Sequence, residues 1–138
     1  MLKKIFKKQK KKDLNSENIL ITALLIHAAK IDENYTDTEK KIIKKALMEL
    51  NSISSEETEA LIKLAEKKEE ESNQIVEFTK EIKKYSMEFR LKIIEIIWKI
   101  VYSDGTSDSY ESNLIRRICG LLYISDKDSG IIKSNLKK

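Results

Sequence analysis

The near-absence of helix-breaking residues constrains this chain most, because its 138 residues include no proline and only three glycines. Proline interrupts helices and glycine marks tight turns, so the shortage of both favours an all-α fold over barrels or sandwiches rich in hairpins. Hydrophobic residues make up 41% of the chain, which is enough for a core, and the length suits one domain. We therefore predict a compact single-domain helical bundle.

A degenerate internal repeat, offset by 72 residues, divides the chain into two related halves. Asp32 aligns with Asp104 and Glu39 with Glu111, and the apolar stretch before the first aspartate recurs before the second. Each copy has the pattern of an apolar helix, a short acidic turn, an amphipathic helix, another turn and a final helix. Each unit is too small for a good core alone. We therefore expect the two pseudo-symmetric halves to pack together with their apolar helices in the middle.

Apolar periodicity and turn signals together predict about seven helices. We place them over residues 16–30, 37–51, 55–70, 74–85, 87–102, 109–122 and 126–136. Their starts carry N-cap residues, whose side-chain oxygens accept a hydrogen bond from a free backbone N–H of the first turn. The predicted caps are Ser16, Thr36, Ser54, Ser86, Asp108 and Ser125. The strongly polar segment 67–73 between the halves is predicted to be a solvated helix end.

The net charge of +4 is unevenly distributed along the chain. Residues 1–12 contain no acidic residue, and their seven lysines are Lys3, Lys4, Lys7, Lys8, Lys10, Lys11 and Lys12. Subtracting these seven charges from +4 leaves −3 for residues 13–138. We predict a flexible basic segment over residues 1–15, followed by a helical domain over residues 16–138.

Three functions remain open for the basic segment: a solubilising tail, a contact with an anionic membrane, or an arm that binds nucleic acid. In a helix, Leu2, Ile5 and Phe6 would form a small apolar face flanked by lysines, as in peptides that lie on anionic membranes. Nucleic acid is disfavoured, because only Phe6 interleaves with the lysines and no base-reading module follows. The apolar stretch 19–29 is too short and interrupted for a transmembrane helix, and we expect no cleaved leader.

Several short elements follow one another in a recognisable order. They are AAKID at residues 28–32 with Glu39 in the first half, and Trp98, YSDG at 102–105, YE at 110–111, LIRR at 114–117 and LL at 121–122 in the second. With these elements the sequence resembles the TerB-like family, named after tellurite resistance, over roughly residues 16–136. The resemblance implies a compact all-helical domain with two related halves and a role in stress response or tellurite resistance.

The two acidic turns form the candidate functional site. Asp32 and Glu39 from the first half and Asp104 and Glu111 from the second supply four carboxylates, which the repeat symmetry could bring together. Such oxygen ligands suit a hard divalent cation, Ca²⁺ or Mg²⁺, and no other cofactor is expected. The favoured alternative is structural: aspartates at helix exits bond to turn backbone, and the glutamates complete N-caps. The first turn also departs from the family pattern, with Glu33 in place of the usual glycine.

No catalytic constellation is visible, so we predict that the protein is not an enzyme. His27 is the only histidine and lies on a largely apolar helix, which favours a core or near-core position over a catalytic base. Cys119, the only cysteine, lies among apolar residues and is predicted to be a buried core residue. The pair Arg116 and Arg117 is interpreted as part of a solvated face.

These observations predict a cytoplasmic binding or adaptor domain with a protein partner that the sequence does not identify. A purely structural or cochaperone-like interaction module without metal is the first alternative. An enzyme acting on an acidic or phosphorylated small molecule is the least favoured, because it rests only on the two arginines. Peripheral contact with the inner face of the membrane would depend on the basic segment.

Overall fold

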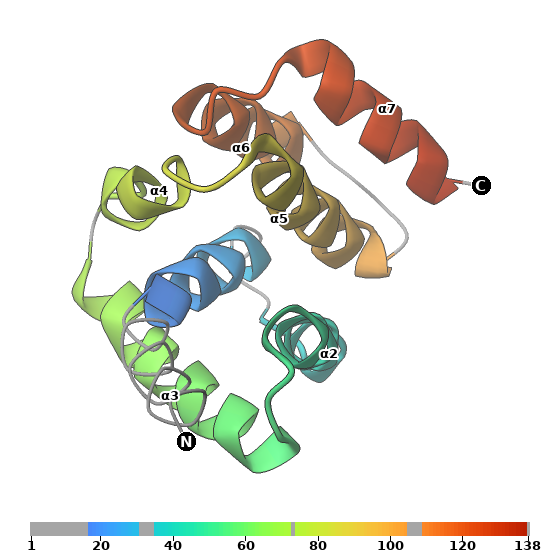
Figure 1. Ribbon diagram of the computed structural model, residues 1–138. Coiled ribbons are helices and arrows are strands. Elements are labelled where there is room, and N and C mark those ends of the chain that lie inside the picture. Colours follow the sequence, from blue (N-terminus) through green and yellow to red (C-terminus); the bar gives the residue numbers. More distant parts are fainter. Residues whose placement is uncertain (1–16, 31–34, 73, 105–108, 138) are drawn as a thin grey trace, which may run out of the picture.

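The computed structural model describes residues 17–30, 35–72, 74–104 and 109–137, with backbone alone at residues 104, 109–112 and 137 (Figure 1). The described elements are a helix over residues 17–29, α2 (Asp37–Asn51), α3 (Ser55–Glu71), α4 (Val76–Ile82), α5 (Met87–Val101), the 3-10 helix η1 (Tyr102–Asp104), α6 (Ser109–Leu121) and α7 (Asp126–Lys137). These residues include no strand. The all-α prediction is therefore confirmed.

The helix boundaries agree with the predicted ones to within one or two residues, except for the fourth helix. The sequence analysis predicted residues 74–85, whereas α4 covers only Val76–Ile82. Ile75 at its N-cap makes no side-chain cap bond, and the chain leaves the helix after Ile82 to reach the start of α5. There Ser86 acts as the predicted cap, accepting a hydrogen bond from the N–H of Phe89 at 3.2 Å.

Three further caps form as the sequence predicted. The Thr36 hydroxyl accepts from the N–H of Glu39 at 3.1 Å, and the Glu39 carboxylate accepts from the N–H of Thr36 at 2.8 Å. This reciprocal pair is a capping box, which satisfies two backbone donors at the start of α2. Ser54 and Ser125 each accept from the N–H three residues later at 3.1 Å. The predicted caps Ser16 and Asp108 lie outside the described residues.

The two apolar helices lie in the middle of the bundle. Figure 1 shows the helix over residues 17–29 and α5 at the centre, with α3 on one outer side and α6 and α7 on the opposite side. The consecutive residues 23–26 are all 0% exposed, so the first of these helices is enclosed on every side. In α5, Ile93, Ile94 and Ile97 are likewise 0% exposed. The prediction of two central apolar helices is confirmed.

Both halves share one core. The buried cluster includes side chains from every described helix of both units except α7, whose Ile132 and Leu136 pack against it from outside. Among the elements from α2 to α7, α5 packs most extensively against α7, and it also contacts α2 across the two halves. Two specific hydrogen bonds add to this packing: Trp98 Nε1 donates to Ser129 Oγ at 3.1 Å, and Arg90 Nη1 donates to the Leu122 carbonyl at 2.6 Å. The second bond satisfies a carbonyl at the end of α6 that the helix itself leaves unpaired.

Candidate functional site

Of the four predicted cation ligands, Glu39 is the one whose side chain the structure describes. It is 6% exposed and occupies the third position of α2. Asp32 lies outside the described residues, and Asp104 and Glu111 are described by backbone alone. Because α6 begins at Ser109, Glu111 also occupies the third position of its helix. The backbone therefore preserves the repeat at both glutamates.

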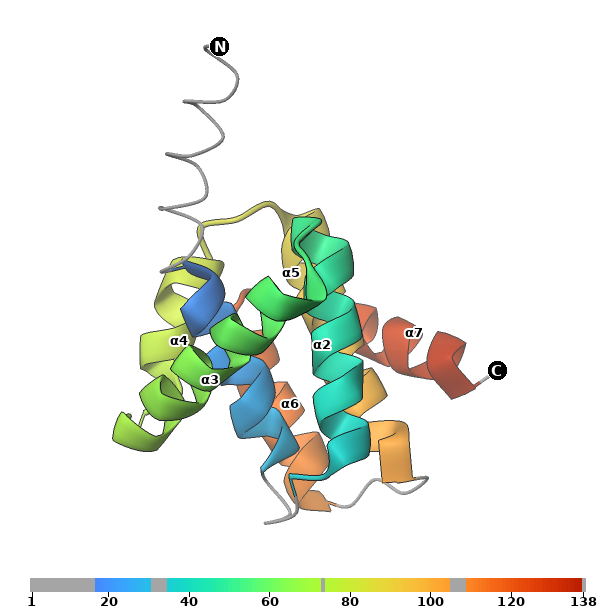
Figure 2. The same ribbon diagram turned by 90° about the horizontal axis from the view of Figure 1, so that it is seen from below.

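The helix ends that flank the two acidic turns lie at one end of the bundle. Figure 2 shows there the end of the helix over residues 17–29, the start of α2, η1 and the start of α6. The described helix ends on either side of both turns therefore lie at the same end of the molecule.

The Glu39 carboxylate is engaged in the capping box. Its Oε1 accepts from the Thr36 N–H at 2.8 Å and from the Thr36 hydroxyl at 3.1 Å. These hydrogen bonds offset the cost of burying a carboxylate, so the predicted capping role of Glu39 is confirmed. Among the described residues no three His, Cys, Asp or Glu side chains are grouped so that they could hold a metal ion. The side chains of Asp32, Asp104 and Glu111 lie outside that description, and the four-carboxylate cation site stays a prediction.

A charged cluster that the sequence analysis missed lies next to the first acidic turn. It consists of His27, Lys30 and Glu69, and we call it the Glu69 cluster. The Glu69 carboxylate accepts a hydrogen bond from Lys30 Nζ at 2.9 Å and lies 3.3 Å from His27 Nδ1. Its side chain is only 11% exposed, so the prediction of a solvated helix end over residues 67–73 was wrong at this residue. The available signal was the i, i+3 spacing of His27 and Lys30, which places two polar groups on one face of an apolar helix.

Tyr35 lies beside this cluster, immediately before α2. Lys40 Nζ lies 4.8 Å and Lys30 Nζ 5.9 Å from the centroid of its ring. Both distances are within the range of cation–π attraction. Burial, and next the nearby Glu66 carboxylate, raise the pKa of the Tyr35 hydroxyl above its usual value. No hydrogen bond of ordinary geometry joins this hydroxyl to a described residue. Lys40 in turn lies 3.7 Å from Glu66 on α3.

Together these contacts fix both sides of the first acidic turn against α3. The Glu69 cluster holds the end of the helix over residues 17–29, and the Lys40–Glu66 pair holds the start of α2. The described part of the site therefore consists of charged contacts that join helix ends to α3.

The remaining sequence candidates have the predicted surroundings. The side chain of His27 is 34% exposed and lies at the edge of the core, as predicted. Cys119 is 1% exposed, and burial raises the pKa of its thiol, so the thiol stays protonated at neutral pH. Arg116 and Arg117 are exposed on α6, in keeping with a solvated face.

The seven lysines of residues 1–12 lie outside the described residues. No helix in the part of the chain that the structure describes is long and apolar enough to cross a membrane.

Comparison with known proteins completes this picture. A search of curated proteins and a search of solved structures found no match. The family model described as tellurite resistance protein TerB matches residues 18–134, from the first central helix to the middle of α7. This match covers both acidic turns and both related units, and the chain therefore belongs to the TerB family.

Proposed function

We propose that this TerB-family chain is a binding or adaptor module rather than an enzyme, and that a divalent cation at its acidic turns tunes its interaction with a protein partner. The observation that carries the proposal is that the helix ends flanking both turns lie at the same end of the bundle (Figure 2). Four carboxylates at that end would offer the oxygen ligands that Ca²⁺ and Mg²⁺ prefer. A role in stress response, with tellurite resistance as the family label, is part of the proposal.

The residues present suit such a cation in their chemistry. Glu39 would have to serve as helix cap and ligand at once, because Thr36 already donates to its carboxylate. Asp32 and Asp104 come before α2 and α6 in the chain and do not occupy the capping position of Glu39. They are therefore the decisive ligands to test.

Isothermal titration calorimetry with Ca²⁺, Mg²⁺, Mn²⁺ and Zn²⁺ tests the cation. We expect heat of binding with Ca²⁺ or Mg²⁺, and its loss in the double variant Asp32→Asn/Asp104→Asn. Asp37→Asn is the matched control, because Asp37 is an exposed carboxylate in the first turn of α2 but is not among the four proposed ligands. No heat with any of the four ions, or equal binding in the double variant, would overturn the cation part of the proposal.

A metal-free interaction module is the second candidate, favoured by the capping role of the Glu39 carboxylate. Affinity purification of the full chain with and without a chelator separates the two. A partner that is released by chelator, and is not retained by Asp32→Asn/Asp104→Asn, supports the cation-tuned module. A partner retained equally under all these conditions supports the metal-free one.

We also propose that the basic segment brings the module to the cytoplasmic face of an anionic membrane. Each lysine near such a surface contributes about 1 kcal/mol, so the seven in residues 1–12 form a substantial attraction. Sedimentation with phosphatidylserine-containing vesicles would compare the full chain with a chain starting at Asp13. We expect only the full chain to sediment with the vesicles, and we expect salt to release it. Equal partitioning of the two chains onto the vesicles would overturn the proposed membrane contact.

A further inference from the structure

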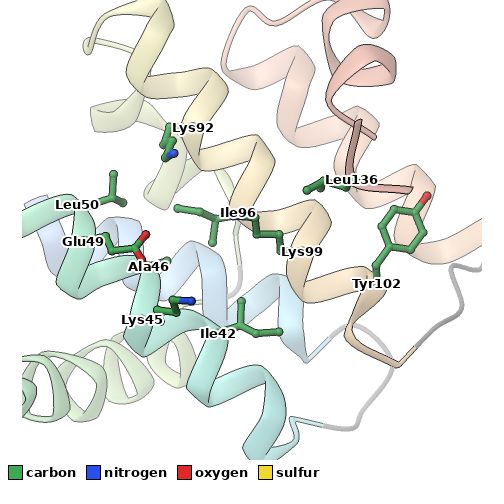
Figure 3. A pocket seen from close by; sticks show the side chains of 10 residues that line it. All are labelled: Ile42, Lys45, Ala46, Glu49, Leu50, Lys92, Ile96, Lys99, Tyr102 and Leu136. Atoms are coloured by element: carbon green, nitrogen blue, oxygen red, sulfur yellow. The ribbon is translucent and has the colours of Figure 1, made fainter. Parts of the chain in front are cut away.

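A groove at the contact of α2 and α5 has no role in the proposed cation site. Its volume is about 630 Å³, and the last turns of α7 close it on one side (Figure 3). Figure 3 shows side chains from α2 and α5 facing one another across it. The apolar residues that line it are Ile42, Ala46 and Leu50 from α2, Ile96 from α5, and Tyr102 and Leu136 on the α7 side.

α2 carries apolar side chains beyond those that it buries fully, and they remain partly exposed in the groove. Ile43 and Leu47 of the same helix are 0% exposed and supply its contribution to the core. Ile42 and Ala46 directly precede these two residues, Leu50 follows Leu47 by three positions, and all three are only partly buried. They are spaced four residues apart, so they form a stripe that is slightly inclined to the axis of α2 and rises about 12 Å along it. Anchors at positions i, i+4 and i+7 of a partner helix span about 10 Å, which matches this stripe.

The rim of the groove is predominantly positive. Lys45, Lys92 and Lys99 line it with a single carboxylate, that of Glu49. Lys92 is partly neutralised by Glu95, 3.4 Å away. Lys45 and Lys99 are exposed and form no ion pair with any residue that the structure describes. An apolar stripe between unpaired lysines is complementary to a helix with an apolar face flanked by acidic residues.

The chain itself does not supply such a helix among its obvious candidates. Residues 1–12 carry a small apolar face, but their seven lysines would be repelled by the rim. On a second copy, the large exposed apolar side chains lie singly on different elements rather than in a stripe. They are Leu64, Val76, Met87, Tyr123 and Ile131.

We infer that the groove between α2 and α5 binds an acidic amphipathic helix of a partner protein. The inference rests on the proposed function as a binding module and names the surface and the kind of partner. It does not depend on the cation. The lysines steer and orient the acidic flanks, and the stripe from Ile42 to Leu50 buries the apolar face.

The probes are three synthetic peptides of about 18 residues, or five helical turns. The first has leucines on one helical face flanked by glutamates, the second has the same composition in scrambled order, and the third has lysines in place of the glutamates. Binding to the full chain is measured by fluorescence anisotropy, and the site by backbone NMR shifts. We expect the acidic peptide to bind best, with shifts centred on Ala46, Ile96 and Leu136.

Variants at the groove separate charge from apolar contact. Lys45→Glu/Lys99→Glu changes two exposed side chains, so folding is retained while affinity for the acidic peptide falls at least about tenfold and that for the lysine peptide rises. Ala46→Glu places a charge in the stripe and should also weaken binding at least about tenfold. Lys67→Glu is the matched control, an exposed lysine on α3 away from the groove, and should leave binding unchanged.

Several outcomes would overturn the inference. They are equal binding of the scrambled or lysine peptide, no groove shifts with the acidic peptide, and equal affinity in the double charge variant. Groove shifts with sodium laurate but not with peptide would assign a small anionic amphiphile instead. Groove shifts that grow with protein concentration alone would assign a second copy. If the groove variants still retain a partner that chelator releases, the inference fails while the proposed function stands.

Discussion

Two carboxylates, the buried Glu39 and the largely buried Glu69, show how single residues shape the end of the bundle next to the acidic turns. Glu39 is held by the two donors of Thr36, and Glu69 by Lys30 with His27 close by. A buried carboxylate without such partners would cost several kcal/mol, so each position depends on its neighbours. The hydrogen-bond donors of Glu39 belong to the start of its own helix. The partners of Glu69 on α3, Lys30 and His27, lie 39 and 42 residues earlier in the chain.

Replacing Glu69 by alanine should destabilise the protein by about 1–2 kcal/mol, because a charge-assisted hydrogen bond is lost and Lys30 and His27 lose their partner. Urea unfolding followed by circular dichroism measures the change. Glu70→Ala is the control, because Glu70 is exposed, and should alter the unfolding free energy by less than about 0.5 kcal/mol. Equal effects of the two substitutions would contradict the assigned role of Glu69.

The raised pKa values of two tyrosine hydroxyls lead us to expect a loss of stability at alkaline pH. Burial is the largest cause of a raised pKa at both Tyr35 and Tyr85, followed by Glu66 at the first and by the hydrogen-bonded Glu17 at the second. In the unfolded chain both phenols titrate near pH 10, so above about pH 10 the unfolded state binds fewer protons than the folded one. Their contribution is therefore complete below that pH and is lost progressively as pH rises above it, toward the raised pKa values of the folded state.

The measurement is the urea midpoint at a series of pH values across this window. We expect the midpoint of Tyr35→Phe/Tyr85→Phe to fall less steeply with pH than that of the unaltered protein, whatever its value at neutral pH. Tyr123→Phe, at a residue that is 67% exposed, is the control and should keep the original slope. Parallel profiles for all three proteins would contradict the prediction.

At the scale of helices, N-cap bonds mark where four of the described helices begin. α2 starts where Thr36 and Glu39 satisfy each other's backbone donors, and α3, α5 and α7 start at Ser54, Ser86 and Ser125. These bonds join residues three positions apart, so residue type at fixed spacing was enough to predict them. The extent of α4 was predicted poorly, because its ends carry no side-chain cap and depend on the path to α5.

Thr36→Ala should lower the free energy of unfolding by about 1 kcal/mol, because α2 loses the hydroxyl that accepts from the Glu39 N–H. Thermal and urea unfolding measure this loss. Thr38→Ala is the matched control at an exposed position inside the same helix, where alanine favours helix and should leave stability unchanged or slightly raised. A loss at Thr38 as large as that at Thr36 would argue against the cap as its cause.

At the scale of the molecule, one core makes the two related units a single folding unit. Its buried cluster runs through the helix over residues 17–29 and α5 and takes in side chains from α2, α3, α4 and α6. The two halves also contact one another directly, since α2 from the first half packs against α5 from the second. Small domains with one core commonly unfold in a single cooperative transition.

We therefore expect one transition seen identically by two probes. Trp98 is the only tryptophan and lies buried in α5 of the second half, so its fluorescence reports that half. Far-UV circular dichroism reports the helices of both halves. Coincident urea curves are the expected result, and a fluorescence midpoint separated from that of circular dichroism would show that the halves unfold independently.

The parts of the candidate site that recur in both halves of the sequence could be predicted. The alignment of Glu39 with Glu111 correctly placed both at the third position of their helices, because a repeated local pattern folds into repeated local structure. The Glu69 cluster and the groove at α2 and α5 were not predicted. Each depends on side chains from separate elements, such as Ile42, Ile96 and Leu136, whose meeting leaves no local signature in the sequence.

The sequence by itself determined the all-helical fold, the four cap positions that the structure describes, and the identity of the two central helices. These follow from apolar periodicity and from hydrogen bonds over three or four residues, which act within a few turns of chain. Only the tertiary structure decided three features. A glutamate in a polar run is largely buried, four helix ends lie at one end of the bundle, and partly buried apolar residues on α2 line a groove with a lysine rim. Those features arise from how whole helices cross and pack, which depends on contacts between residues far apart along the chain.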